Sequence, residues 1–320
     1  MIRIAVLGAG GHSTREHGPA LKAVKEERPN EVELAAVCDL KEDKARAYAE
    51  AFGFERTYTD LDRMLDEVKP DGLVAVTPIV LTEPIITRLL PRGIPLLIEK
   101  PPWEDSEATR RLMDVARRTG TPHMVSFNRR FSPAIRKARE WLAAHAGDRP
   151  PHLVLGRMLR HRRREGDFAV GTGIHPVDAI LSFLGPPEHV HARRTPGTVQ
   201  GCFSFKAVLE FPGGRQALLA LSPESGVLEE TYEIHGTDYC IQVDTWQCRV
   251  RAFEGGEEVL SWRAPDDARP EFASGAYHEA AAFVRGVQEG EGLAPDLAEA
   301  LASMRISEAI QGAKSCRLTP

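Results

Sequence analysis

Apolar and polar positions follow two different patterns in the two halves of the chain. In the first half, short continuous apolar runs alternate with longer stretches in which apolar and charged residues mix. Continuous runs are typical of strands buried on both faces, and the mixed stretches are typical of helices. This alternation predicts an α/β domain with a doubly wound parallel sheet, which binds ligands at the carboxyl ends of its strands. The predicted strands are residues 2–7, 32–38, 71–76, 94–98 and 122–126, and the helices about 18–28, 41–52, 60–68, 82–92 and 104–119.

In the second half, the pattern changes to one dominated by strands. A helix predicted at 133–145 is followed by the turn-rich sequence GDRPPH, and the sequence FPGGRQ predicts a hairpin. We expect an α+β domain with a large open, mostly antiparallel sheet, which closes with two helices near 272–289 and 295–312. The domain boundary is placed at residue 122, giving domains 1–122 and 123–320. The predicted strands are 152–161, 189–194, 201–211, 215–222, 229–236, 239–244, 248–253 and 257–262.

The composition of the 320 residues is that of an ordinary globular protein, with 42% hydrophobic and 27% charged residues. No apolar run reaches the ~18 residues of a membrane span, and the apolar N-terminal run stops at glycines, which predicts a strand rather than a secretion signal. The net charge of −5 argues against a nucleic-acid or membrane partner. Five cysteines without zinc-type spacing predict reduced thiols, a cytoplasmic location and no metal site. They are Cys38, Cys202, Cys240, Cys248 and Cys316.

A glycine-rich loop follows the first predicted strand. Its residues are Gly8, Gly10, Gly11, His12 and Ser13, where Ser13 stands in place of the third glycine of the G-x-G-x-x-G pattern. Glycines allow a tight turn and a close approach of the backbone to a pyrophosphate. We therefore expect a dinucleotide phosphate loop, with a plain strand–helix turn as the alternative. Pro19 suggests that the following helix starts late.

An acidic residue closes the second predicted strand. The carboxylate of Asp39 can accept hydrogen bonds from both ribose hydroxyls of a dinucleotide. An acid at this point repels a 2′-phosphate, so that NAD is the expected cofactor. Lys41 and Lys44 keep NADP as an alternative, and Asp39 could instead be a helix N-cap.

A lysine lies at the end of a later strand, in the sequence IPLLIEKPP. Lys100 would face the ligand side of the sheet, and a positively charged nicotinamide nearby would lower the pKa of its ammonium group. The lysine could then act as a general acid/base. The alternative is a solvated lysine at a turn.

Five short motifs occur in an order that resembles one family. They are the glycine loop, Thr77-Pro78, Glu99-Lys100-Pro101, FNRRF at 127–131, and the pair His175 and Asp178. The chain resembles the glucose–fructose oxidoreductase, inositol dehydrogenase and rhizopine-catabolism (Gfo/Idh/MocA) family. The resemblance implies a Rossmann domain, an α+β domain with an open sheet, and NAD(P)-dependent oxidoreduction of a sugar, sugar acid or cyclitol. It also implies that Lys100 is the catalytic lysine and that Thr77, Pro78 and Glu99 lie at the cofactor.

The sequence departs from this family at two points. Family members have an acid four residues before the histidine, where this chain has Gly171. Lys100 and His175 could suffice, or an acid from elsewhere could substitute. Ile79 and Thr82 replace a polar residue and a histidine of the family. Pro176 predicts a helix start that leaves His175 exposed, with a capped or packed histidine as the alternative; Asp178 would reach the substrate or orient His175.

Arginines form a basic run just before the histidine segment, at residues 157–164. Arginine binds carboxylates and phosphates through two parallel hydrogen bonds, so that Arg160 and Arg162 could hold an acidic substrate. A solvated strand end or an intersubunit surface is the alternative. Arg129, in the motif FNRRF, is a further substrate candidate, although either arginine of that motif could brace the domain instead.

Together these features predict an NAD(P)-dependent oxidoreductase. Lys100 removes the hydroxyl proton with help from His175, while hydride passes to the cofactor. Two alternatives remain: a dinucleotide-binding sensor without turnover, and a lyase or hydrolase that retains NAD. Open sheet edges favour a homodimer or homotetramer.

Overall fold

The chain forms two compact units in the computed structural model, which describes residues 1–318. The first unit contains Met1–Asn128 and Ala276–Leu301, and the second contains Arg129–Gly275 and the residues from Ala302 onward. The single boundary predicted at residue 122 differs from this division, because a later segment returns to the first unit. That segment packs through Phe283 and Val287 against Gly72, where an added Cβ would lie 3.1–3.2 Å from both side chains.

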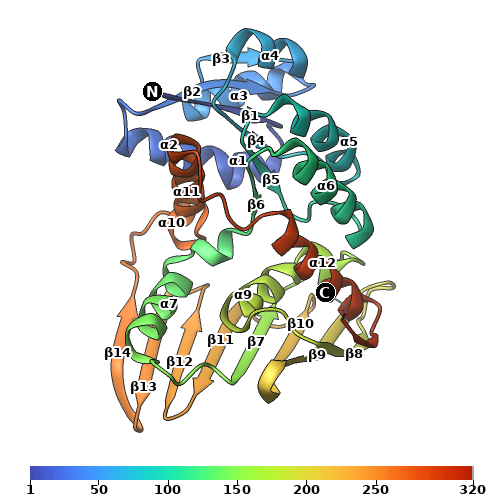
Figure 1. The fold of residues 1–320 in the computed structure, drawn as a ribbon, viewed down its shortest axis with the longest axis vertical. Helices are drawn as coiled ribbons and strands as arrows, with labels where there is room; N and C mark the ends of the chain where they lie inside the picture. Colours follow the sequence, from blue (N-terminus) through green and yellow to red (C-terminus); the bar gives the residue numbers. More distant parts are fainter. Residues whose placement is uncertain (319–320) are drawn as a thin grey trace. The chain divides into compact units, whose positions relative to one another are not determined.

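The first unit is built on a six-stranded sheet in the order β3-β2-β1-β4-β5-β6, and every pair is parallel. This order confirms the predicted doubly wound sheet (Figure 1). The three-residue strand β3 was not predicted, because it is too short to form a recognisable apolar run. The strands are β1 (Ile2–Leu7), β2 (Val32–Cys38), β3 (Arg56–Tyr58), β4 (Gly72–Ala75), β5 (Leu96–Glu99) and β6 (His123–Ser126).

Helices connect these strands, and one helix comes from the far end of the chain. Helix α11 packs against α2 and β1, and the hydroxyl of Ser126 donates to Oε2 of Glu279 at 2.8 Å, which ties α11 to the end of β6. The helices of the unit are α1 (Gly11–Arg15), α2 (His17–Glu27), α3 (Glu42–Phe52), α4 (Leu61–Val68), α5 (Ile79–Leu89), η1 (Leu90–Arg92), α6 (Ser106–Thr119) and α11 (Ala276–Glu289). Helix α12 (Leu297–Gln311) contains the last change from one unit to the other.

The first helix starts earlier than predicted. Helix α1 begins at Gly11, directly after the extended residue Gly10, and α2 begins at His17. Pro19 lies within the first turn of α2, where its missing N–H has no intrahelical acceptor to lose. The prediction of a late start was therefore wrong, and the glycine loop is short.

The second unit is built on a nine-stranded sheet in the order β14-β13-β12-β11-β7-β10-β9-β8-β15. Only β7 and β10 pair in parallel; the other pairs are antiparallel. The hairpin predicted at FPGGRQ joins β9 to β10. The strands are β7 (Leu153–Leu159), β8 (His189–Pro196), β9 (Phe203–Phe211), β10 (Arg215–Ser222), β11 (Glu229–Gly236), β12 (Tyr239–Asp244), β13 (Arg249–Glu254), β14 (Glu257–Arg263) and β15 (Ser315–Arg317).

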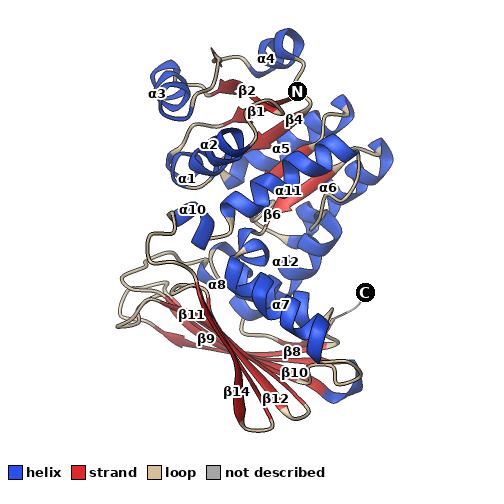
Figure 2. Cartoon of the chain, turned by 90° about the vertical axis from the view of Figure 1, so that its left-hand side faces the viewer, coloured by secondary structure: helices blue, strands red, loops and turns tan. Residues whose placement is uncertain are grey.

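Helices cover one face of this sheet (Figure 2). Helix α7 contacts β12 and β13, and α9 contacts β7 and β10. Gly156 in β7 allows the close approach of α9, since an added Cβ would lie 3.0 Å from Cδ1 of Ile180. The helices are η2 (Asn128–Phe131), α7 (Pro133–His145), α8 (Phe168–Gly171), α9 (Ile174–Leu184), η3 (Pro212–Gly214) and α10 (Pro270–Ala273).

The other face of the nine-stranded sheet carries exposed apolar side chains. Leu218 of β10 is 43% exposed, and a hollow of about 590 Å³ is lined by residues of β7, β8, β9 and β10 around it. Across residues 1–318, no helix has the length and apolar character needed to cross a membrane. The five cysteines of the chain are free thiols.

Candidate functional site

The glycine loop lies at the carboxyl end of β1. Its surroundings leave no room for a side chain at Gly8 but leave open space at Gly10 and Gly11. Gly8 has a φ of +99°, and a Cβ on it would overlap the carbonyl oxygen of Val76. Only glycine can occupy such a position. At Gly10 and Gly11, an added Cβ would meet nothing within 4 Å. The loop therefore offers an open backbone surface, as a pyrophosphate requires.

Ser13 stands in place of the third glycine and faces the interior. Its side chain is fully buried, and its hydroxyl donates to the hydroxyl of Tyr48 at 3.1 Å. Burial raises the pKa of Tyr48, so that its phenol stays protonated. The hydroxyl of Ser13 therefore fixes α1 against α3, and the contact predicted between Ser13 and a cofactor stays a prediction.

Asp39 links the end of β2 to the glycine loop. Its Oδ2 accepts the backbone N–H of Ala9 at 2.8 Å, and its Oδ1 accepts that of Lys41 at 2.9 Å. The N-cap position of α3 belongs to Lys41, so that the N-cap alternative for Asp39 is wrong. Each carboxylate oxygen keeps a second lone pair for a ribose hydroxyl. The glycine cradle and this carboxylate together fit a dinucleotide.

Thr77 and Pro78 form the turn between β4 and α5. The hydroxyls of Thr77 and Thr82 lie 2.9 Å apart, and the Thr82 hydroxyl donates to the carbonyl oxygen of Pro78 at 3.3 Å. Thr82 is buried. Thr82, which stands where the family has a histidine, thus closes the turn through local hydrogen bonds. Ile79, the other residue that differs from the family, is the first residue of α5.

Glu99 ends β5 and joins two histidines of the glycine-loop segment. Its Oε1 lies 3.0 Å from Nε2 of His12, and its Oε2 lies 3.0 Å from Nε2 of His17. Burial raises the pKa of the Glu99 carboxyl, but the hydrogen bonds and charges of the two histidines outweigh burial and hold the pKa well below its usual range. His12 and Glu99 were each predicted as cofactor residues, but no sequence pattern predicts that they converge with His17.

Lys100 follows Glu99 directly at the carboxyl edge of the six-stranded sheet, and its peptide bond to Pro101 is cis. It is half-buried. Because Glu99 is bonded to His12, the chain segment that carries the lysine is held at the glycine loop.

His175 is the second residue of α9 and is buried, with 9% of its surface exposed. The prediction of an exposed helix end was wrong, because α9 begins at Ile174 and the unpredicted helix α8 comes immediately before it. The backbone N–H of His175 donates to the carbonyl oxygen of Thr172 at 3.3 Å.

Asp178 is fully buried and is held by a two-point ion pair. Nε and Nη2 of Arg130 donate to its two oxygens at 2.6 and 2.7 Å, and the hydroxyl of Ser303 donates to Oδ1 at 3.2 Å. The donors of these contacts belong to the second unit, and the carboxylate that they surround has no exposed surface. The geometry favours a bracing role for Arg130 and Asp178 over contact with a substrate.

Gly171 leaves space beside another acid. A Cβ added to Gly171 would lie 3.3 Å from Oδ2 of Asp167. Asp167 stands one helical turn earlier, where its carbonyl oxygen accepts the N–H of Gly171 at 2.8 Å. The carboxylate of Asp167, which was not predicted as a site residue, therefore lies beside the position from which an acid at 171 would extend.

A buried carboxylate organises two of the predicted substrate arginines. Glu230 is fully buried, Nη2 of Arg160 lies 2.7 Å from its Oε2, and Nε of Arg129 lies 3.1 Å from each of its oxygens. Burial raises the pKa of Glu230, but the charges of Arg129 and Arg160 outweigh burial and lower it overall. Arg129 and Arg160 therefore have an internal partner, which favours a structural role for both.

The rest of the basic run is also bonded within the unit or exposed. Nε of Arg157 lies 2.9 Å from Oε1 of Glu229, and Nη2 of Arg163 lies 2.6 Å from Oε1 of Glu165. Arg162 is exposed on a turn with a φ of +55°. Of the arginines predicted to touch a substrate, Arg162 alone is exposed.

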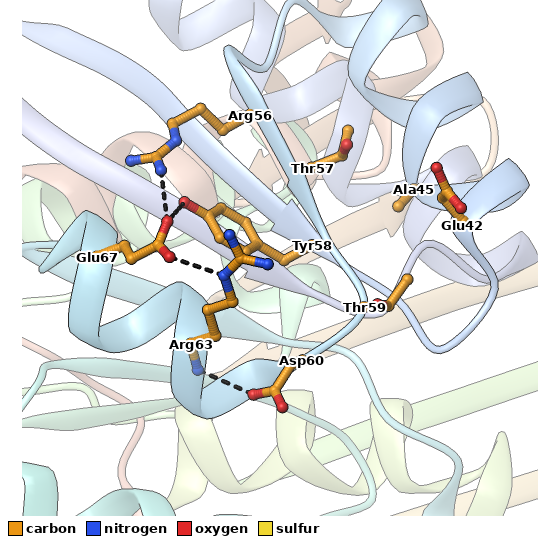
Figure 3. Close-up of a pocket in the computed structure, with 9 residues that line it drawn as sticks. All are labelled: Glu42, Ala45, Arg56, Thr57, Tyr58, Thr59, Asp60, Arg63 and Glu67. Carbon is orange, nitrogen blue, oxygen red and sulfur yellow. Dashed lines mark hydrogen bonds and ion pairs between the residues drawn. The ribbon is translucent and has the colours of Figure 1, made fainter.

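A separate pocket of about 260 Å³ lies around β3, between α3 and α4. Figure 3 shows Glu67 bonded to three of the lining side chains: Arg56 and Arg63 each donate to it at 2.7 Å, and the hydroxyl of Tyr58 donates to it at 3.0 Å. No site residue predicted from the sequence lines this pocket.

Comparisons with known proteins match both units. A model described as an oxidoreductase family with an NAD-binding Rossmann fold matches residues 2–127, and a GFO/IDH/MocA C-terminal domain model matches residues 119–242. A D-glucoside 3-dehydrogenase of Escherichia coli is 28% identical over 64% of this chain and 61% of its own length. A D-xylose 1-dehydrogenase (NADP(+)) of Haloferax volcanii is 25% identical over 95% of each chain. The structure of a levoglucosan dehydrogenase in complex with NADH has a TM-score of 0.85 at 17% identity, covering 99% of each chain.

Proposed function

Because the chain belongs to the Gfo/Idh/MocA family of NAD-binding oxidoreductases, we propose that it transfers a hydride between NAD and a hydroxyl or carbonyl carbon of a sugar, sugar acid or cyclitol. The observation that carries this proposal is the contact between Glu99 and the glycine-loop residue His12. This contact supports the placement of Lys100, the next residue, beside a dinucleotide bound at the loop.

The cofactor is assigned to the residues that fit it. Backbone groups of Gly8, Gly10 and Gly11 would hold the pyrophosphate. The carboxylate of Asp39 would accept hydrogen bonds from the ribose hydroxyls. When bound, NAD supplies the hydride acceptor. Asp39 favours NAD, and NADP is retained as the alternative because the xylose dehydrogenase relative carries NADP(+) in its name.

Lys100 is assigned as the general acid/base. Its Nζ would take the proton of the reacting hydroxyl in oxidation and return it in reduction. His175 would assist, and its burial at the start of α9 would hold the ring in a defined orientation.

We assign the missing carboxylate to Asp167. Gly171 leaves room for it, and Asp167 is exposed at the start of the helical segment that leads to His175. Among the predicted substrate residues, Arg162 stays the candidate for contact with an acidic group, while Arg129, Arg160 and Asp178 brace the second unit.

The substrate class rests on the relatives, which are named as dehydrogenases of a glucoside and of xylose. We further propose that the protein is cytoplasmic and associates as a homodimer or homotetramer through the uncovered face of the nine-stranded sheet. The exposed Leu218 and the hollow around it support this surface. Light scattering after size-exclusion chromatography, with Leu218→Glu as the disrupting variant, tests the association.

The function is tested by titrating purified protein with NADH and NADPH, followed by a panel of sugars, sugar acids and cyclitols monitored at the reduced-nicotinamide absorbance. Binding with turnover is the expected result. Failure of both dinucleotides to bind would refute the assignment of the glycine loop.

A second candidate function is a dinucleotide-binding sensor without turnover. Gly171 favours it because this glycine stands where the family has an acid. Tight NADH binding with no turnover on the panel would support it. Substrate conversion without net NADH would instead support a lyase or hydrolase with retained NAD.

A further inference from the structure

His12, His17 and Glu99 form a cluster to which the proposed reaction assigns no proton or hydride transfer, although the His12–Glu99 contact positions Lys100. The three residues belong to α1, to the first position of α2 and to the end of β5, and these three elements are labelled in Figure 1. One ligand atom of each lies within 4.8 Å of the others. We infer that this cluster binds a divalent transition-metal ion of the Zn²⁺ class.

The donor set has the chemistry that such ions prefer. Two imidazole nitrogens and one carboxylate oxygen bind Zn²⁺ and its first-row neighbours, whereas Mg²⁺ and Ca²⁺ prefer oxygen ligands alone. In a tetrahedral site with bonds of 2.0–2.1 Å, ligand atoms lie about 3.4 Å apart. Each imidazole Nε2 already lies 3.0 Å from an oxygen of Glu99. Small rotations of the side chains therefore suffice to admit the ion.

The burial of the three residues suits a site with an entrance. The side chains of His17 and Glu99 are 5% and 11% exposed, and that of His12 is 40% exposed. Two ligands are thus held by the fold, while the third can swing to admit an ion from solvent. A fourth position on the solvent side remains for water.

Arg15 allows an experiment to distinguish a metal site from a cluster that is held by hydrogen bonds alone. Its Nη2 lies 3.3 Å from Nδ1 of His12. A guanidinium can only donate, so this contact favours the tautomer of His12 whose proton is on Nε2, the nitrogen that must bind the metal. A neutral imidazole bound to metal through Nε2 carries its proton on Nδ1. Arg15 therefore opposes metal binding, and its side chain is 70% exposed and lies 3.3 Å from Oε1 of Glu16 through its Nε.

The test is a titration of untagged, chelator-treated full-length protein with Co²⁺, followed by its visible absorption, and competition of the bound Co²⁺ by Zn²⁺. We expect one Co²⁺ per chain, without the near-ultraviolet thiolate band that a cysteine ligand would add. His12→Gln should weaken binding at least ~10-fold, the lower end of losses seen for residues that support a metal. Arg15→Gln should bind Co²⁺ as tightly as the parent protein or more tightly.

His12 is the residue replaced first because it is the most exposed of the three ligands, so that its replacement disturbs the fold least. Circular dichroism checks that the variant folds. His17→Gln and Glu99→Gln extend the series where they fold. Absence of a cobalt spectrum in the parent protein would overturn the inference. An unchanged spectrum in His12→Gln, or a loss in Arg15→Gln as large as that in His12→Gln, would overturn it as well. Because no dinucleotide or substrate is present, these outcomes do not depend on the proposed reaction.

Discussion

The carboxylate of Asp39 accepts the backbone N–H of Ala9 at 2.8 Å, across 30 positions of sequence. This bond joins the end of β2 to the glycine loop at the end of β1. The same carboxylate is the group that we assign to the cofactor ribose. Asp39 therefore shapes the loop and is expected to set the preference for the cofactor.

Replacing Asp39 should change both properties. In Asp39→Ala, two hydrogen bonds to backbone N–H groups are lost, and the free energy of unfolding should fall by about 1–3 kcal/mol. Loss of the negative charge should also shift the ratio of NADPH to NADH affinity by at least ~10-fold toward NADPH. Chemical denaturation and fluorescence titration measure the two effects. An unchanged ratio would argue that the ribose lies elsewhere.

Replacing Lys100 separates catalysis from binding. Lys100→Ala should lower kcat at least ~10²-fold, the scale of general acid/base catalysis, while the Kd for NADH changes little. His175→Asn should lower kcat as well, and the double variant should lose less than the product of the two single losses if both groups act on one proton. Additive losses would show that the two residues act independently.

Asp167 can be tested by moving its carboxylate. Asp167→Asn should lower kcat/KM about 10-fold or more if this acid assists proton transfer. In Asp167→Ala, adding Gly171→Asp should then restore activity, since the shortened residue 167 leaves room for a side chain at 171, whose Cβ would lie 3.3 Å from the original Oδ2. Steady-state kinetics of the two variants decide the matter, and full activity of Asp167→Asn would remove this residue from the mechanism.

The buried ion cluster around Glu230 should make the second unit sensitive to acid. The pKa of Glu230 is lowered in the folded protein, because Arg129 and Arg160 outweigh the effect of burial. Its contribution to stability is present above the unfolded pKa of about 4.3 and is lost as the pH falls through the lower folded pKa. At pH 7, Glu230→Gln should therefore cost about 3–5 kcal/mol, since it removes the carboxylate that pairs with the buried Arg160 and the half-buried Arg129.

Thermal denaturation between pH 7 and pH 3 checks this dependence. The Tm difference between the parent protein and Glu230→Gln should be largest at neutral pH and should narrow below pH ~4.3. Glu233→Gln is a matched control on the same strand, since Glu233 is half-buried and lies 4.0 Å from Arg157. A pH-independent difference would mean that charge contributes little to this cluster.

The order of strands and the placement of Asp39 and Lys100 follow from local pattern. Residues that directly follow buried parallel strands lie at one edge of the sheet, so their grouping is predictable without coordinates. The helix start at Gly11 could not be predicted from Pro19, because this proline lies in the first turn of the second helix, α2, and not of α1. Strands β3 and β15 were missed because three residues carry too little periodicity.

The roles of the arginines could not be predicted, because their partners are far away in sequence. Arg129 and Glu230 are separated by 101 positions, and Arg130 and Asp178 by 48. A basic run shows only that positive charge is present. Whether that charge is neutralised internally depends on which acids the fold buries beside it. The burial of His175 likewise depends on α8, a four-residue helix without a sequence pattern of its own.

Helix α11 completes the first unit with residues made more than 140 positions after that unit's last strand, which ends at Ser126. On the ribosome, β1 to β6 therefore emerge with the apolar surface around Gly72 still uncovered, and Phe283 and Val287 reach it only after the whole nine-stranded sheet except β15 has been synthesised. Synthesis from the N-terminus normally lets an early domain fold first. Here the early unit can finish only when synthesis is nearly complete, and a fragment ending at residue 128 would lack the helix that seals its core.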